Sequence, residues 1–191
     1  MSRSPNLVAH SIAYHAKHNA DGEIMVFGDQ RITWQSLKPR AFKLANALIK
    51  AGVKKDDKVG FMFYNSPEFI EINYAIQIAG GVPVPMNYRF TANEIEYQVN
   101  NSDSKILLYD DVFNEAIDAA IPNLANVSSF ICHGKTTIDG VLDYENFLNS
   151  GEDKDPQVPN EWEDTCVMIY TGGTTGFPKG VMLTYKGHLD M

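Results

Sequence analysis

The chain has 191 residues, of which 44% are hydrophobic and 21% are charged, and its formal net charge is −8 at pH 7. This is the composition of a folded protein with a sizeable core, so it argues against a disordered chain. The negative charge argues against nucleic acid or an anionic membrane surface as a general partner. No apolar run approaches the roughly eighteen residues that a membrane-spanning helix needs.

The histidines and cysteines do not predict a metal site or a disulfide framework. Cys132 and Cys166 each lie inside an apolar run and are expected to be buried thiols, which favours a cytoplasmic protein. Residues 1–5 lack the apolar core of a secretory signal. His15 and His18 share one face of an expected helix, but no third ligand accompanies them at a suitable spacing. We therefore expect no metal held by protein side chains alone.

The first fifty residues predict a helix, a β-hairpin and a second helix. A cap-and-proline start predicts the first helix over residues 4–17. Two short apolar runs, 24–27 and 31–34, flank a Gly-Asp-Gln turn and predict the hairpin. Apolar residues at helical spacing predict a second helix that begins after residue 33 and ends before Gly52.

From residue 59 onward, strand-like apolar runs alternate with helical patterns. The runs that predict strands are 59–63, 82–85, 105–109 and 127–132. The segments between them predict helices, beginning at Ser66-Pro67, at Thr91 and near Val112. Alternation of this kind indicates βαβ units. The predicted fold is therefore α/β, with a largely parallel sheet flanked by helices and an N-terminal β-hairpin.

A change of composition divides the chain into three parts. Residues 1–132 form the predicted N-terminal α/β subdomain. Residues 133–164 are polar, with a charged, proline-containing centre, and are expected to connect this subdomain to the C-terminal part of the chain. One short helix is expected within this connection, over 141–148. Residues 165–191 are expected to form a strand, a loop, a second strand and the start of a helix.

The most informative stretch is Tyr170-Thr171-Gly172-Gly173-Thr174-Thr175-Gly176-Phe177-Pro178-Lys179-Gly180. It follows the apolar run 166–170, which predicts a buried strand, and a second apolar run, 181–183, comes directly after it. Glycines let a backbone approach a ligand closely, and successive N–H groups in such a loop form an anion-binding concavity. The threonine hydroxyls add donors, and the lysine adds a positive charge. Together they predict a polyphosphate site.

The loop does not have the pattern of the P-loop NTPases, which is G-x-x-x-x-G-K-[ST]. Lys179 follows Pro178 rather than a glycine, and Gly180 occupies the place of the Mg²⁺-binding Ser or Thr. Proline also disfavours helical geometry at Phe177, so no helix is expected to begin there. A plain hairpin turn without a ligand needs only about two to five residues. The pattern therefore favours a ligand-binding strand–loop–strand element.

The stretch from Tyr170 to Gly180 resembles the phosphate-loop signature of the AMP-forming adenylating enzymes. These are the acyl-CoA synthetases, the adenylation domains of peptide synthetases and the firefly-type luciferases. The usual wording is Y-T-S-G-T-T-G-x-P-K-G, so Gly172 stands where Ser is commonest. Shorter words, such as Asn65-Ser66-Pro67-Glu68-Phe69 and the run from Ala79 to Pro85, occur in the same order in acyl-CoA synthetases. The likeness covers about residues 24–185.

The resemblance implies that the chain is part of the large N-terminal domain of an acyl-adenylate-forming ligase. In this family a carboxylate attacks the α-phosphate of ATP, Mg²⁺ bridges phosphate oxygens, and a thiol such as coenzyme A takes the acyl group. The likeness assigns the β- and γ-phosphates to seven loop residues: Thr171, Gly172, Gly173, Thr174, Thr175, Gly176 and Lys179. The Thr-Thr pair and Phe177 favour a ligase of fatty acids, long-chain ones included, or of aromatic acids over a peptide-synthetase domain.

Family members continue well beyond Met191, so the resemblance implies an N-terminal fragment that is inactive alone. Such a piece is expected to expose apolar surface and to self-associate. A non-catalytic nucleotide-binding or interaction module is the alternative from a different class. Tyr185 stands where the family commonly has His, either near the substrates or packed at an interface. The sequence does not give the acyl chain length.

Overall fold

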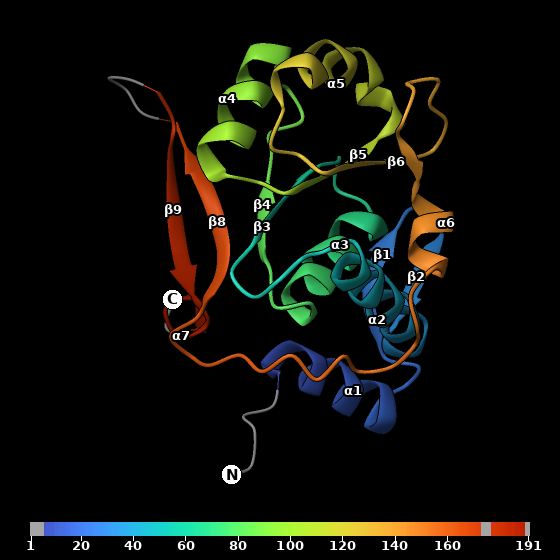
Figure 1. The fold of residues 1–191 in the computed structure, drawn as a ribbon. Coiled ribbons are helices and arrows are strands. Elements are labelled where there is room, and N and C mark those ends of the chain that lie inside the picture. Colours follow the sequence, from blue (N-terminus) through green and yellow to red (C-terminus); the bar gives the residue numbers. More distant parts are fainter. Residues whose placement is uncertain (1–5, 173–176, 190–191) are drawn as a thin grey trace.

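The fold is organised around a parallel sheet in the order β4-β3-β5-β6-β7 (Figure 1). The structure is a computed structural model that describes residues 6–172 and 177–189. The strands of the sheet are β3 (Lys58–Met62), β4 (Val82–Pro85), β5 (Ile106–Asp110), β6 (Ser129–His133) and β7 (Leu142–Asp143). All four pairings between neighbouring strands are parallel. This confirms the α/β fold class predicted from the sequence.

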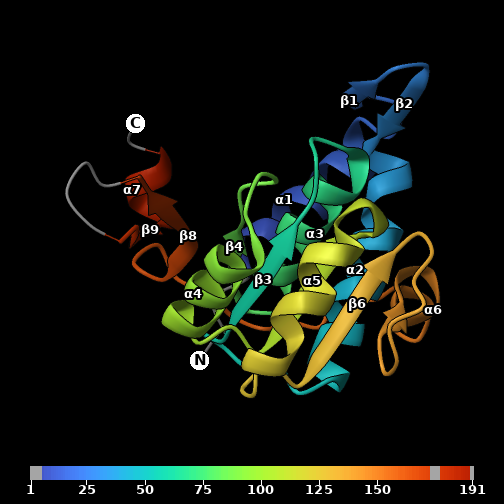
Figure 2. The ribbon, with the colours of Figure 1, turned by 90° about the horizontal axis from the view of Figure 1, so that it is seen from above.

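Two antiparallel ribbons stand outside this sheet. One is the N-terminal hairpin of β1 (Glu23–Phe27) and β2 (Gln30–Thr33). The other is formed by β8 (Thr165–Thr171) and β9 (Lys179–Thr184) near the C-terminus. Seen from above, the hairpin projects at one end of the molecule, and the β8–β9 ribbon lies beside α4 and the edge strand β4 (Figure 2).

Helices cover both faces of the parallel sheet. They are α1 (Leu7–His18), α2 (Trp34–Lys50), α3 (Pro67–Ile78), α4 (Ala92–Ser102), α5 (Asn114–Ala120), α6 (Tyr144–Asn149) and α7 (Tyr185–Leu189), with short 3₁₀ turns at Asp111–Phe113 and Ile121–Asn123. One face packs against α2, α3 and α6, with α1 packed on α2 and α3, and the other face packs against α4 and α5, while α7 lies against the β8–β9 ribbon (Figure 1). No helix in the described part of the chain is long and apolar enough to cross a membrane.

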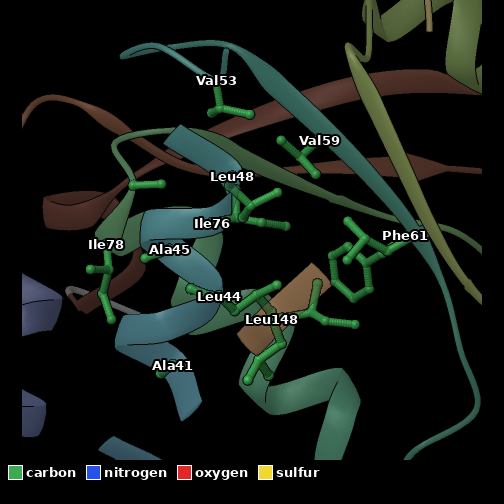
Figure 3. Close-up of a cluster of buried hydrophobic side chains, with 14 of the residues drawn as sticks. Ala41, Leu44, Ala45, Leu48, Val53, Val59, Phe61, Ile76, Ile78 and Leu148 are labelled. Atoms are coloured by element: carbon green, nitrogen blue, oxygen red, sulfur yellow. The ribbon is translucent and has the colours of Figure 1, made fainter. Parts of the chain in front are cut away.

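The central strand β5 shows why the strand-like runs lack polar residues. Ile106 and Leu108 belong to the core under α2 and α3, whereas Leu107 and Tyr109 belong to the core under α4 and α5. All four are at most 1% exposed. A strand covered on both faces needs apolar side chains at every position, so it reads as an unbroken run. Figure 3 shows the first of these cores, where side chains of α2 meet those of α3, β3 and α6.

Local signals fix the ends of several helices. The capping box predicted at Thr91 is present: its N–H donates to Glu94 Oε2 at 2.8 Å. Gly52 and Gly80 follow α2 and α3 with φ of 101° and 82°, a left-handed conformation that glycine adopts without steric cost. The first helix begins at Leu7 with Asn6 as its cap, and the expected start at residues 4–5 lies outside the described residues.

The two edge strands of the parallel sheet, β4 and β7, differ in how well the sequence predicted them. Strand β4, which contains Pro83 and Pro85, pairs with β3 alone and forms an edge of the sheet, as its prolines predicted. The single helix expected over 141–148 is wrong in its first residues, because Leu142 and Asp143 extend the sheet as β7 and α6 begins only at Tyr144. The Asp143 side chain caps that helix by accepting from Asn146 N–H at 2.8 Å.

The polar stretch after α6, residues 150–164, is hydrogen-bonded to α1 and α2. Asn46 of α2 donates to the carbonyl oxygens of Glu152 and Lys154, both at 2.8 Å. Leu7 N–H at the start of α1 donates to Asn160 Oδ1 at 2.7 Å. The stretch therefore runs along the helices, past α1, before it reaches the β8–β9 ribbon (Figure 1). The three-part division at residues 132 and 164 stays a prediction.

Candidate functional site

The candidate site lies at the end of the β8–β9 ribbon where β8 ends and β9 begins. The last pairs of its antiparallel register are Tyr170 with Gly180 and Thr171 with Lys179. Residues 172–178 connect the two strands. Strands are thus present on both sides of the predicted loop, and β9 begins at Lys179, two residues before the apolar run that predicted it.

Three of the predicted phosphate-binding residues meet at the base of this loop. Thr171 and Lys179 face each other across the ribbon, and Thr171 Oγ1 donates to the Lys179 carbonyl oxygen at 3.5 Å. Gly172 comes next, and among the described residues beyond its chain neighbours no atom lies within 4 Å of the place where its Cβ would stand. All three are exposed. The other four predicted residues, Gly173, Thr174, Thr175 and Gly176, lie outside the described residues.

Lys179 keeps its charge available for an external partner. None of the ion pairs among residues 6–172 and 177–189 involves it. An ammonium group that is exposed and unpaired interacts with an incoming anion without first breaking a salt bridge. Gly172 directly follows Thr171, the residue that pairs with this lysine, and its lack of a side chain allows a close approach to the backbone. In the described part of the loop, the Lys179 side chain and the Gly172 backbone are therefore both exposed to solvent.

Helix α4 contacts both ends of the loop. Tyr97 Oη donates to the Pro178 carbonyl oxygen at 2.8 Å, and its ring stacks on Phe177 with centroids 5.0 Å apart. One turn further along α4, Asn101 Oδ1 accepts a hydrogen bond from Tyr170 Oη at 2.6 Å. Burial raises the pKa of Tyr170 to about 12, so its hydroxyl remains a donor at neutral pH. Sequence reasoning missed these contacts, although the i, i+4 spacing of Tyr97 and Asn101 places them on one helix face.

A cavity of about 420 Å³ adjoins these contacts, between α4 and the ribbon. Its walls include four aromatic rings, those of Phe90, Tyr97, Tyr170 and Phe177. Phe177 is 75% exposed. The stack of Phe177 on Tyr97 is therefore partly open to solvent and to the cavity.

The burial expected for β8 is wrong for most of its length. Within β8 only Cys166 is buried, whereas Ile169 is 40% exposed and its partner Val181 is 42% exposed. The described chain supplies a layer to only one face of the ribbon, the one beside β4 and α4. An unbroken apolar run records hydrophobicity on both faces, but it does not say which segment covers each face.

Tyr185 packs in the interior rather than at the loop. It is 8% exposed at the start of α7, and its Oη accepts a hydrogen bond from Asn160 Nδ2 at 3.0 Å. The same Asn160 side chain accepts from the Leu7 N–H, so it joins the starts of α1 and α7. Burial raises the pKa of Tyr185. Of the two roles left open by the sequence, this contact supports packing at an interface.

The remaining predicted features concern thiols and metals. Cys132 and Cys166 are free and buried, as predicted. Within residues 6–172 and 177–189, no group of three or more His, Cys, Asp or Glu side chains is placed to hold a metal ion. His15 stacks on Trp34 and His18 stacks on Tyr14, which are packing contacts.

A largely parallel sheet followed by two strands that flank a glycine-rich sequence is the arrangement that the resemblance to adenylate-forming enzymes predicts. Residues 12–191 match the family described as AMP-binding enzyme. The match extends over most of the chain, and the chain belongs to this family. The resemblance drawn from the phosphate-loop signature is thereby confirmed.

Curated relatives of the chain are CoA ligases. It is 30% identical over 179 residues to a 4-hydroxybutyrate–CoA ligase of Metallosphaera sedula, an alignment covering 90% of this chain and 33% of that protein. It is 32% identical over 190 residues to a medium/long-chain-fatty-acid–CoA/3-oxocholest-4-en-26-oate–CoA ligase of Mycolicibacterium smegmatis, covering 94% and 34%. The chain thus spans about one third of the length of these relatives.

Solved structures share the fold. The anthranilate CoA ligase AuaEII, in complex with anthranoyl-AMP, superposes with a TM-score of 0.89 at 22% identity, over 97% of this chain and 36% of that one. The inhibitor-bound N-terminal domain of FACL13 from Mycobacterium tuberculosis superposes with a TM-score of 0.82 at 27% identity, over 97% and 45%. The described architecture is therefore that of the N-terminal domain of such ligases.

Proposed function

We propose that this chain is the N-terminal part of an ATP-dependent, AMP-forming acyl-CoA synthetase and that its loop from Thr171 to Lys179 binds the β- and γ-phosphates of ATP. The observation that supports this most directly is the exposed Thr171–Lys179 pair beside the open backbone of Gly172. The proposed set of loop ligands also includes Gly173, Thr174, Thr175 and Gly176. Curated relatives that are CoA ligases support the reaction class.

The proposed chemistry requires a catalyst that offsets negative charge. A carboxylate attacks the α-phosphate, and pyrophosphate leaves with additional charge on its oxygens. Lys179 would place a mobile ammonium beside those oxygens, and the Thr171 hydroxyl would exchange its 3.5 Å bond to the Lys179 carbonyl oxygen for a hydrogen bond to a phosphate oxygen. Coenzyme A would then accept the acyl group from the adenylate. The residues of this chain therefore act in binding and in charge stabilisation.

We propose that Mg²⁺ binds together with ATP, as the Mg²⁺–ATP complex. The described residues offer no cluster of metal ligands, so the ion would be held chiefly by phosphate oxygens at the loop. When bound, it would neutralise part of the phosphate charge.

The proposed acid substrate is a fatty or related carboxylic acid. Support comes from relatives named for medium- and long-chain fatty acids, while others are named for 4-hydroxybutyrate and ferulate. We also propose a cytoplasmic location, where ATP and coenzyme A are available. The exposed apolar side chains of the ribbon, which include Ile169, Val181 and Met182, are the surface through which we expect this chain to self-associate.

Binding of ATP and AMP to a lysine variant tests the phosphate site. Lys179→Ala should weaken ATP binding by about 1.5–3 kcal/mol, roughly tenfold to a hundredfold in Kd, because it removes a charge-assisted contact. AMP lacks the β- and γ-phosphates, so its Kd should change little. Titration calorimetry, or NMR for millimolar affinities, measures both.

Lys154→Ala is the matched control, since Lys154 is an exposed lysine whose charge pairs only with Glu152 among the described residues. It should leave both Kd values unchanged. Equal ATP affinity in the wild type and in Lys179→Ala would contradict the proposed site and would favour a module with another role.

A further inference from the structure

Helix α4 holds both ends of the phosphate loop with side chains that lie one helical turn apart. Tyr97 contacts the outgoing end at Phe177 and Pro178, and Asn101 contacts the incoming end through Tyr170. Pairs at i and i+4 point from the same face of a helix, so a single rigid element sets the separation of the two ends. We propose that Tyr97 and Asn101 are positioning residues that set the spacing of Thr171 and Lys179 at the base of the phosphate loop.

The C-terminal end of the loop, at Phe177 and Pro178, is the end that leads directly into Lys179. The carbonyl that accepts from Tyr97 belongs to the peptide that joins Pro178 to Lys179. A peptide group is planar, so fixing its oxygen also fixes the direction in which the Lys179 backbone begins. The Lys179 side chain then starts from a defined point beside Thr171. Tyr97 therefore acts on the phosphate through Lys179, without touching the ligand itself.

Packing alone would not hold this end in place. Phe177 is 75% exposed, and the cavity of about 420 Å³ lies next to its stack on Tyr97. A ring that borders an open space has fewer neighbouring atoms, so the van der Waals attraction that positions it is weaker. The hydrogen bond from Tyr97 Oη and the stacking geometry are thus the main restraints on residues 177–178 that the structure describes.

The incoming end is restrained in a similar way. The hydrogen bond from Tyr170 Oη to Asn101 joins the residue before Thr171 to α4 at 2.6 Å. Tyr170 pairs with Gly180, directly after Lys179 in β9. Both ends of the loop are therefore tied to the same helix as well as to each other. Small shifts at either end would therefore change the spacing of Thr171 and Lys179.

The inference rests on the proposed phosphate site, and a set of variants separates the two. Tyr97→Phe keeps the ring on Phe177 but removes the hydrogen bond, so the Kd for ATP should rise about three- to tenfold. Asn101→Ala should act in the same direction. The Kd for AMP should stay within about twofold in both, because positioning acts on the phosphate tail. Tyr64→Phe is the matched control, since Tyr64 also contacts aromatic rings but its Oη makes no hydrogen bond among the described residues.

A double-mutant cycle distinguishes positioning from a general structural effect. If Tyr97 acts through Lys179, Tyr97→Phe should have little further effect on ATP binding in a Lys179→Ala background. Additive effects in the cycle, or equal losses for ATP and AMP, would overturn the inference while the phosphate site stands. If Lys179→Ala itself leaves ATP binding unchanged, the proposed function fails first. Thermal midpoints of all variants show that the fold is retained.

Discussion

A buried carboxylate joins three helices on one face of the sheet and supports a stability test. Glu71 of α3 is 4% exposed and accepts hydrogen bonds from Arg40 of α2 and from Tyr144 of α6, which is fully buried. Arg40 also pairs with the exposed side chain of Glu145, at 2.6 Å. Tyr144→Phe removes one donor to Glu71 and leaves the shape of the core unchanged.

The structure gives the size of the expected effect. A hydrogen bond to a charged group contributes about 1.5–3 kcal/mol, so Tyr144→Phe should lower the free energy of unfolding by that amount at about pH 8. For a chain of this length this corresponds to a drop of about 3–12 °C in Tm. The matched control is Tyr74→Phe on α3, because Tyr74 is half-buried and its Oη has no hydrogen bond among the described residues.

The pH dependence adds a second test. Burial raises the pKa of Glu71 above its unfolded value of about 4.3, against the lowering effect of Arg40 and Tyr144. Its contribution to stability is therefore present below the unfolded pKa and is lost as the pH rises through the folded pKa. Losing the Tyr144 donor raises the folded pKa further, so the cost of Tyr144→Phe should be larger at about pH 8 than at about pH 4. Urea unfolding at both pH values measures it. A cost below about 0.5 kcal/mol at the higher pH, or a larger cost at the lower pH, would refute the reasoning.

Two further substitutions test how the segment after α6 is attached. Asn160→Ala leaves the Leu7 N–H and the Tyr185 hydroxyl without their partner, so urea unfolding should show a loss of about 2–4 kcal/mol; a loss below about 0.5 kcal/mol would contradict this role. Gly151→Ala would bring a Cβ to 1.9 Å from the Lys43 carbonyl oxygen, so the free energy of unfolding should fall by more than about 2 kcal/mol. Gly172→Ala places a Cβ within 4 Å of no atom of the described residues beyond its chain neighbours, so it should change this free energy by less than about 0.5 kcal/mol.

The parallel sheet could be predicted because its signals are local. An apolar run such as that of β5 identifies a strand covered on both faces, and a proline pair such as that of β4 identifies an edge. The capping box at Thr91 and the glycines after α2 and α3 mark helix ends from a few neighbouring residues. Strand order is not local in this sense. The position of β4 on one side of β3 and of β5 on the other depends on packing between segments far apart in the chain.

In the candidate site, too, the local features could be predicted from the sequence and the long-range contacts could not. Its ligand class could be predicted from the glycines, threonines and lysine of one continuous stretch. Its support from α4 could not, because Tyr97 and Pro178 are 81 positions apart and neither has a distinctive local pattern. The exposed side of β8 was missed for a related reason, since hydrophobicity alone does not identify the covering layer. Tyr185 was open to two roles, and only its contact with Asn160 favours one of them.

The central claim is that the end of the β8–β9 ribbon binds a chain of phosphates. Titration of the ¹⁵N-labelled protein with magnesium tripolyphosphate, followed by NMR chemical shifts, tests this without an adenine ring. We expect the largest chemical-shift changes at the amides of Thr171, Gly172 and Lys179, and we expect Lys179→Ala to abolish them. Shifts that are scattered over the surface, or that concentrate away from the ribbon, would contradict it.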